Sequence, residues 1–335
     1  MKKNRRVYFL ALVSGMLLYA CGSASNDSSP PPDPRPEIIA LLPDANETSA
    51  FLTDPILAVF DEMMSPADAS TFLVHGAFTG RRLMGTYSGG GTETLTFDPD
   101  ADFRVGEEIE VTLTEGLAST AGRPAVPFVY RFRAEVLSGS GILAGVASVA
   151  GQTDARGVAA GDWDADGDLD LAVANFGANS LAILFNDGAG AFSNTQTITG
   201  LQGATAISAG DWDADGDLDL AVANFGANSL AILFNDTSGS FSNTRTIASL
   251  RGATAISAGD WDADGDLDLA VANFGANSVV ALRNNGAGFF STVQTITGQF
   301  GARGLAAGDW NSDGSLDLVS ASSGDNSVKL LRNQP

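Results

Sequence analysis

Cysteine and histidine are almost absent from this chain of 335 residues, which contains one of each, Cys21 and His75. A single cysteine excludes an intramolecular disulfide. Because residues 142–335 contain neither residue type, that region also lacks the means for Ser–His or Cys–His catalysis and for a His/Cys zinc site. Hydrolysis by paired carboxylates is the catalytic chemistry that the composition leaves open.

Basic residues are also scarce, with 18 Lys and Arg against 40 Asp and Glu and a formal net charge of −22. Nucleic acids and anionic lipids are themselves negatively charged, so this balance argues against either as a direct partner of the folded chain. An acidic surface that serves only solubility is the alternative interpretation.

The acidic residues gather in a nine-residue segment that recurs every 49 residues. It reads DWDADGDLD at 162–170, 211–219 and 260–268, and DWNSDGSLD at 309–317. A fixed period of this length is typical of one supersecondary unit that is stacked repeatedly.

The spacing within the segment suits a hard cation. In the first copy, aspartates occupy positions 1, 3, 5, 7 and 9, and Gly167 at position 6 permits a sharp turn. Ca²⁺ takes six to eight oxygen ligands, and alternate positions of a tight loop can direct several carboxylates at one point. Position 7 normally supplies a backbone carbonyl, which agrees with the serine at that position in the fourth copy, Ser315.

The candidate ligands are therefore the odd-numbered positions of all four loops, and we expect about four structural Ca²⁺ ions. These residues are Asp162, Asp164, Asp166, Asp168, Asp170, Asp211, Asp213, Asp215, Asp217, Asp219, Asp260, Asp262, Asp264, Asp266, Asp268, Asp309, Asn311, Asp313, Ser315 and Asp317.

The loop is not an EF-hand, because that motif needs a bidentate Glu at position 12 and this chain has Val173 there. A strand-like run, LDLAVAN, follows directly at 169–175. The alternative is an acidic turn without metal, but aspartates packed this closely repel one another unless a cation lies among them.

Segments such as GDWDADGDLDLAVANFGANSLAILFNDGAGAF (161–192) resemble FG-GAP/VCBS repeats, the calcium-loop blades of integrin α-subunit propellers and many bacterial surface proteins. The resemblance covers roughly 142–335 and implies β-propeller blades with Ca²⁺ in the loop between the first two strands. This chain differs from the family in having Trp at position 2 of each loop and four repeats where seven are usual.

Each repeat is predicted to hold four strands, and the run VASVA (146–150) is counted with similar runs at 195–199, 244–248 and 293–297. We expect a closed four-bladed ring or a compact arc, since closure removes exposed sheet edges. Pairing with a second copy of the chain to complete a larger ring is the main alternative.

Two recurring features are candidates for ligand contact. The turn FGANS, first seen at 176–180, could present equivalent contacts to a glycan, although Gly and Asn there also suit an ordinary turn. The tryptophans at position 2 could stack on sugars, but periodic large aromatic residues more often pack between repeats.

The N-terminus indicates export. A basic segment (1–6) precedes an apolar stretch of 14 residues (7–20), which is short for a membrane span and typical of a signal peptide. The sequence LYAC at 18–21 resembles a bacterial lipoprotein signal, which implies cleavage before Cys21 and lipidation of that residue. Residues 1–21 are thus assigned to the signal, and the Ser/Pro-rich residues 22–36 to a disordered tether.

Residues 37–136 have a different composition, with short alternating apolar runs broken by Gly, Pro and Asp. About a hundred residues of this kind predict a β-sandwich. The stretches 56–70 and 96–132 resemble bacterial Ig-like domains of surface proteins.

These observations predict an all-β chain in which an Ig-like β-sandwich precedes a four-repeat β-propeller-like domain with calcium loops. The expected protein is anchored by lipid in the bacterial envelope, in the periplasm or on the surface, and is a non-catalytic module for binding or adhesion. A glycan or a protein is the expected ligand. A carbohydrate-active enzyme and a purely structural envelope component are the alternatives.

Overall fold

The structure is a computed structural model that describes residues 35–78, 82–136, 148–311 and 313–333. Residues 35–335 belong to one compact unit, separate from residues 1–34. The predicted signal peptide, Cys21 and most of the predicted tether therefore lie outside the described residues. No helix among the residues described has the length and apolar composition needed to cross a membrane.

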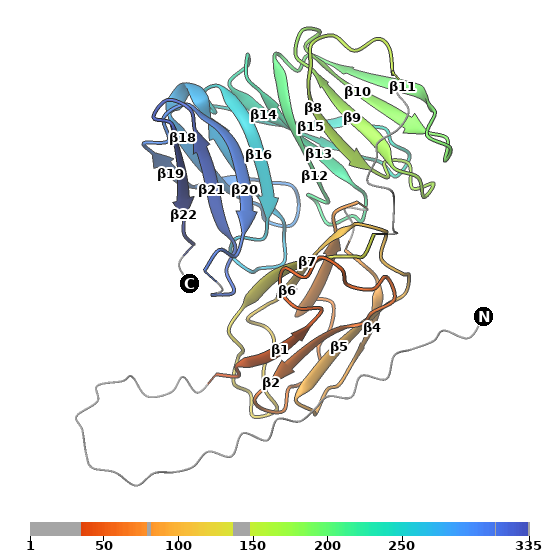
Figure 1. Ribbon diagram of the computed structural model, residues 1–335, viewed down its shortest axis with the longest axis vertical. Helices are drawn as coiled ribbons and strands as arrows, with labels where there is room; N and C mark the ends of the chain where they lie inside the picture. The colour runs from red at the N-terminus through yellow and green to blue at the C-terminus, as the bar shows by residue number, and fades with distance from the viewer. Residues whose placement is uncertain (1–34, 79–81, 137–147, 312, 334–335) are drawn as a thin grey trace. The chain divides into compact units, whose positions relative to one another are not determined.

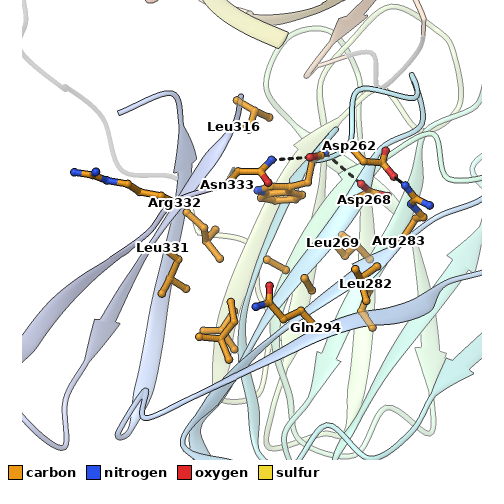
Figure 2. Close-up of a pocket in the computed structure, with 17 residues that line it drawn as sticks. Asp262, Asp268, Leu269, Leu282, Arg283, Gln294, Leu316, Leu331, Arg332 and Asn333 are labelled. Atoms are coloured by element: carbon orange, nitrogen blue, oxygen red, sulfur yellow. Dashed lines mark hydrogen bonds and ion pairs between the residues drawn. The ribbon is translucent and has the colours of Figure 1, made fainter. Parts of the chain in front are cut away.

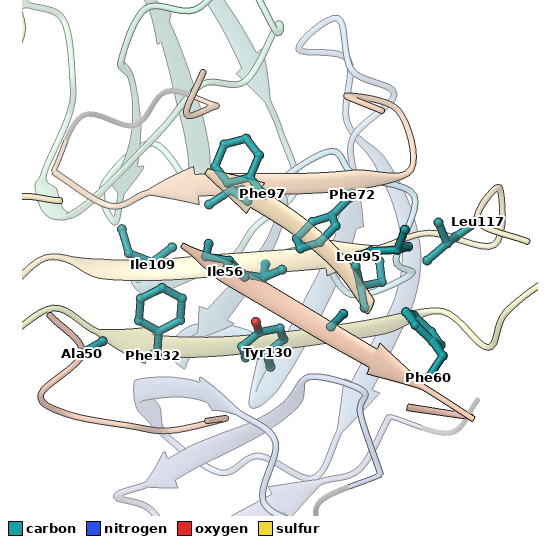
Figure 3. Packing of buried hydrophobic residues seen from close by; sticks show 14 of the residues in the cluster. Ala50, Ile56, Phe60, Phe72, Leu95, Phe97, Ile109, Leu117, Tyr130 and Phe132 are labelled. Carbon is teal, nitrogen blue, oxygen red and sulfur yellow. The ribbon is translucent and has the colours of Figure 1, made fainter. Parts of the chain in front are cut away.

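Residues 38–133 form two antiparallel sheets, with strand orders β1-β2-β5-β4 and β3-β6-β7. The strands are β1 (Ile38–Leu42), β2 (Ile56–Phe60), β3 (Phe72–Gly76), β4 (Gly85–Ser88), β5 (Thr94–Pro99), β6 (Glu108–Leu113) and β7 (Phe128–Arg133). Side chains of alternate residues, such as Leu95 and Phe97 on β5, are fully buried between the sheets. Figure 3 shows them packed with Phe72, Ile109 and Phe132 in the core of this β-sandwich.

The repeat region consists of four further antiparallel sheets, each built from consecutive strands. The first three have four strands and the fourth has three. The strands are β8 (Ala155–Gly161), β9 (Asp170–Asn175), β10 (Ser180–Asn186), β11 (Phe192–Thr199), β12 (Ala204–Gly210), β13 (Asp219–Asn224), β14 (Ser229–Phe234), β15 (Asn243–Ile247), β16 (Ala253–Gly259), β17 (Asp268–Asn273), β18 (Ser278–Arg283), β19 (Ser291–Thr297), β20 (Ala302–Gly308), β21 (Asp317–Ser322) and β22 (Ser327–Leu331). The fold is all-β, as predicted, and among the described residues the only helical segment is the short 3-10 turn η1 (Phe274–Ala276).

The prediction of four strands in every repeat is wrong for the first repeat, at its opening run 146–150. The run at 195–199 ends β11, which is the outer strand of the first sheet and pairs with β10. Each such run therefore closes the sheet before it and does not open the next one. No sheet of the repeat region precedes the run at 146–150, so it has no third strand to pair with. Its described residues, 148–150, form no strand. Val149 instead packs on the first sheet, against the buried cluster of Val173, Ala182 and Leu184.

The first strands of successive sheets, β8, β12, β16 and β20, lie side by side in that order (Figure 1). Buried side chains of neighbouring sheets fill the space between them. Within the residues that the structure describes, β20 does not pack along β8, so the four sheets form an open series rather than a closed ring.

Three of the four tryptophans pack between sheets, as the sequence predicted, and Trp261 is the partly buried one, against the cluster that the third and fourth sheets share. Trp163 and Trp212 are buried, and each indole makes an edge contact with a phenylalanine of the following repeat, Phe241 and Phe290 respectively, at centroid distances of 6.1 and 6.0 Å. Trp310, at the same position in the fourth repeat, is 54% exposed.

Candidate metal centre

Each acidic segment forms the loop between the first and second strands of its sheet. In the first loop, Ala165 has a φ of 60° and Gly167 a φ of 102°, so two left-handed residues reverse the chain within a few positions. The alanine and glycine of the second and third loops adopt the same conformations. The N–H of Asp168 donates to Asp166 Oδ1 at 2.9 Å, which helps to close the turn.

The aspartate at position 9 connects its loop to the third strand of the sheet. Asp170 is buried, and its two carboxylate oxygens accept the N–H groups of Trp163 (3.0 Å) and Asn186 (2.8 Å). The same pair of hydrogen bonds recurs at the three equivalent residues, Asp219, Asp268 and Asp317. Position 9 therefore holds the loop in place whether or not it also contacts a cation.

The structure brings three of the predicted ligand positions together in each of the first three loops. Carboxylate oxygens from positions 1, 3 and 9 lie within 4.8 Å of one another. The three sets are Asp162, Asp164 and Asp170; Asp211, Asp213 and Asp219; and Asp260, Asp262 and Asp268. The aspartates at positions 5 and 7 are outside these sets.

The fourth loop differs because position 3 is Asn311. Its side-chain amide donates to Asp313 Oδ2 at 2.7 Å, and the N–H of Gly314 donates to Asp309 Oδ2 at 2.9 Å. Among the described residues, this loop has no set of three acidic side chains like those of the other repeats.

Four oxygens in the first three loops are buried without a hydrogen-bond partner among the described residues. They are the Oδ1 atoms of Asp162, Asp211, Asp213 and Asp260. A buried acceptor left without a partner is costly, and native structures rarely leave one. A hard cation among these oxygens would satisfy them, and the all-oxygen donor set is the kind that Ca²⁺ prefers.

The electrostatics of the loops also fit a cation. Burial, with a smaller contribution from the neighbouring aspartates, raises the pKa of Asp211 to about 6 and that of Asp219 to about 8. In the third loop, burial raises the pKa of Asp260 to about 8, with a further contribution from the negative charge of Glu110. Without a positive charge nearby, the charged forms of these carboxylates are therefore disfavoured. A bound divalent ion would favour them.

Residues of the Ig-like domain complete the surroundings of two loops, which the sequence did not predict. Thr112 of β6 donates from its hydroxyl to Asp260 Oδ2 at 3.0 Å. Arg104 forms an ion pair with Asp162 at 3.0 Å. Both contacts join residues far apart in the sequence, and nothing in the period of 49 residues indicates them.

An asparagine of the next repeat, buried or partly buried, is hydrogen-bonded to each of the first three loops. The side-chain N–H of Asn235 donates to the carbonyl of Trp163 at 2.7 Å, and Asn284 and Asn333 make the equivalent bonds to Trp212 and Trp261. Figure 2 shows Asn333 beside the third loop, with Asp262 directed toward Arg283. The sequence signal that could have located these asparagines is the recurrence of Asn every 49 residues, at the end of each third strand.

The FGANS turns show structural roles. Asn179, Asn228 and Asn277 are left-handed, with φ between 51° and 54°. The side-chain oxygen of Asn179 accepts the N–H of Gly203 in the next repeat at 2.8 Å, and the other two asparagines do the same. The turns thus connect neighbouring repeats.

Comparison with known families agrees with the fold. The model of the FG-GAP-like repeat family matches residues 162–222, 211–271 and 260–320. The model of the bacterial Ig-like domain family matches residues 33–134. The chain is therefore an FG-GAP repeat protein with an N-terminal bacterial Ig-like domain. The comparison with curated proteins found no match.

Several solved structures show a distant likeness. A putative 6-phosphogluconolactonase from Bacteroides uniformis is 14% identical with a TM-score of 0.42, and 81% of each chain is covered. A functionally unknown protein from Desulfotomaculum acetoxidans is 12% identical with a TM-score of 0.36, and 85% of each chain is covered. The N-terminal part of the bacterial S-layer protein SbsC is 12% identical with a TM-score of 0.24, over 64% of this chain and 44% of that one. Likenesses this distant assign no activity.

The repeats and the Ig-like domain are consistent with a non-catalytic binding protein of the cell envelope or the extracellular space. Three acidic sets able to hold metal ions lie within the repeats.

Proposed function

We propose that this protein is a calcium-binding module of the bacterial envelope, attached by a lipid at Cys21, that binds a glycan or protein ligand without catalysis. The main support is the clustering of three aspartates in each of the first three loops, together with the buried oxygens that have no other partner among the described residues. The FG-GAP match supports Ca²⁺ as the ion.

The proposed metal is structural rather than catalytic. The position-9 aspartates already accept two backbone N–H groups each, and the loops join strands within single sheets. A cation at a loop would hold the first strand against the second and third, so that binding and folding are coupled. An ion at 100 times its dissociation constant stabilises the folded state by about 2.7 kcal/mol per site.

The four sites are not proposed to be equal. The first three loops each offer three clustered carboxylates, whereas the fourth has the neutral Asn311 at position 3. Ca²⁺ affinity depends on ligand charge, so the fourth loop would bind more weakly.

Calorimetric titration of Ca²⁺ into the metal-stripped full chain, combined with thermal unfolding, tests this proposal. We expect three tighter sites, one weaker site and a large rise in the melting temperature. If no calcium binds, or if the melting temperature does not respond to a chelator, the loops are not metal sites.

A further inference from the structure

The outward side of the fourth sheet keeps an apolar surface that the earlier sheets bury. Five positions of the first repeat are at most 1% exposed: Trp163, Ala172, Ala174, Leu181 and Ile183. The five equivalent residues of the second repeat are at most 2% exposed: Trp212, Ala221, Ala223, Leu230 and Ile232. In the fourth repeat the same positions hold Trp310, Val319, Ala321, Val328 and Leu330. Three of these are well exposed, Trp310 at 54%, Val328 at 73% and Leu330 at 44%.

This apolar surface, which we call the donor face, is exposed in the structure, whereas the equivalent surfaces of the first and second sheets are buried by the sheet that follows each. Contiguous exposed apolar residues mark a surface that another molecule covers.

The internal junctions show what the donor face fits. Between the first and second repeats, Trp163 lies in one buried cluster with Leu218, Leu220, Leu233 and Phe241 of the second, and its indole contacts Phe241. The Trp163 carbonyl also accepts the hydrogen bond from Asn235. The next junction repeats this pattern with Trp212, Phe290 and Asn284.

The first repeat carries the matching half of such a junction, which we call the acceptor face. It includes Leu171, Leu184 and Phe192, at positions equivalent to the leucines and phenylalanine that receive Trp163. Asn186 is the equivalent of Asn235; in the structure described, its side-chain N–H donates to the Leu169 carbonyl but not to any tryptophan carbonyl. Val149 covers part of this face, in place of a preceding repeat.

We propose that the donor face of one molecule docks on the acceptor face of a second copy of the same chain. Trp310 would pack against the partner copy's Phe192, its carbonyl would accept from the partner copy's Asn186, and Val149 would leave the face. A second copy is the occupant because it presents the same kind of surface, with the same hydrogen bond, that each internal junction already uses. Such head-to-tail contacts either close into a ring or continue as a chain.

The proposal does not depend on calcium, because neither face includes a carboxylate of the acidic sets. All measurements are nevertheless made in saturating Ca²⁺, so that any effect of the metal on folding is constant. The exported full chain is used with Cys21→Ser, because the predicted lipid would by itself cause molecules to associate.

Sedimentation velocity over a range of protein concentrations tests the contact. We expect larger species to increase with concentration, and Trp310→Ser to weaken association at least tenfold. Met84→Ser is the matched control, because Met84 is an apolar residue of the Ig-like domain that is 73% exposed. A protein that is monomeric at every concentration, or association that Trp310→Ser leaves unchanged, overturns the proposal.

A mixing experiment distinguishes a head-to-tail contact from a symmetric one. Trp310→Ser disables the donor face and Phe192→Ser the acceptor face, so each variant alone should be monomeric. Mixed, they should form dimers that grow no further, because one functional face remains on each molecule. If Phe192→Ser alone still dimerises, or if the mixture remains monomeric, the head-to-tail contact is rejected.

Discussion

At the scale of single residues, the aspartates of one acidic loop differ in their contacts. Asp219 at position 9 joins two strands through backbone hydrogen bonds, whereas Asp213 at position 3 has a buried Oδ1 without a partner in the described structure. Asp217 at position 7 lies outside the acidic set, and the fourth repeat has Ser315 at that position.

These differences predict unequal effects of substitution. Asp213→Ser should remove one tight calcium site and lower the melting temperature in millimolar Ca²⁺, because it deletes a clustered carboxylate. Asp217→Ser removes the same charge but copies a residue that the fourth loop uses, so stoichiometry should be retained. Calorimetric titration and thermal unfolding of both variants measure the contrast; equal behaviour of the two would contradict the assigned ligand set.

At the scale of strands and sheets, neighbouring repeats are joined by buried hydrogen bonds as well as by apolar packing. Asn235 is buried, and its side chain donates to the carbonyls of Trp163 and Leu218. Asn186 occupies the same position in the first repeat and donates to the Leu169 carbonyl.

Asn235→Ala should therefore destabilise the protein more than Asn186→Ala. Removal of the Asn235 amide leaves the buried Trp163 carbonyl without its donor, at a cost of about 1–3 kcal/mol. Denaturant unfolding at low protein concentration, where molecules do not associate, gives the two free energies. Equal losses would mean that the bond to the tryptophan carbonyl contributes nothing.

The sequence predicted the elements well because its signals were local and periodic. The 49-residue period located the loops and the repeating strands, and the alternating runs indicated the sandwich. The run at 146–150 misled the strand assignment, since its composition matches that of β11 but no sheet of the repeat region precedes it. The Thr112–Asp260 and Arg104–Asp162 contacts could not be predicted, because no local pattern specifies which distant loops meet.

At the scale of the whole molecule, charge bears on how the protein is held at a membrane. A formal net charge of −22 repels an anionic lipid surface, so electrostatic adsorption is unfavourable. The described residues contain no helix suited to crossing a membrane. A covalent lipid at Cys21 is the attachment that we propose.

Cys21→Ser should accordingly move the protein from the membrane fraction to the soluble fraction of the cell. The rest of the chain is unchanged by this substitution, so calcium stoichiometry and melting temperature should equal those of the parent. Fractionation, with incorporation of a labelled fatty acid into the parent protein, measures the effect. Two results would show that Cys21 is not the anchor: a parent protein that takes up no labelled fatty acid, or a Cys21→Ser protein that stays in the membrane fraction. Another contact would then have to hold the chain at the membrane despite its negative charge.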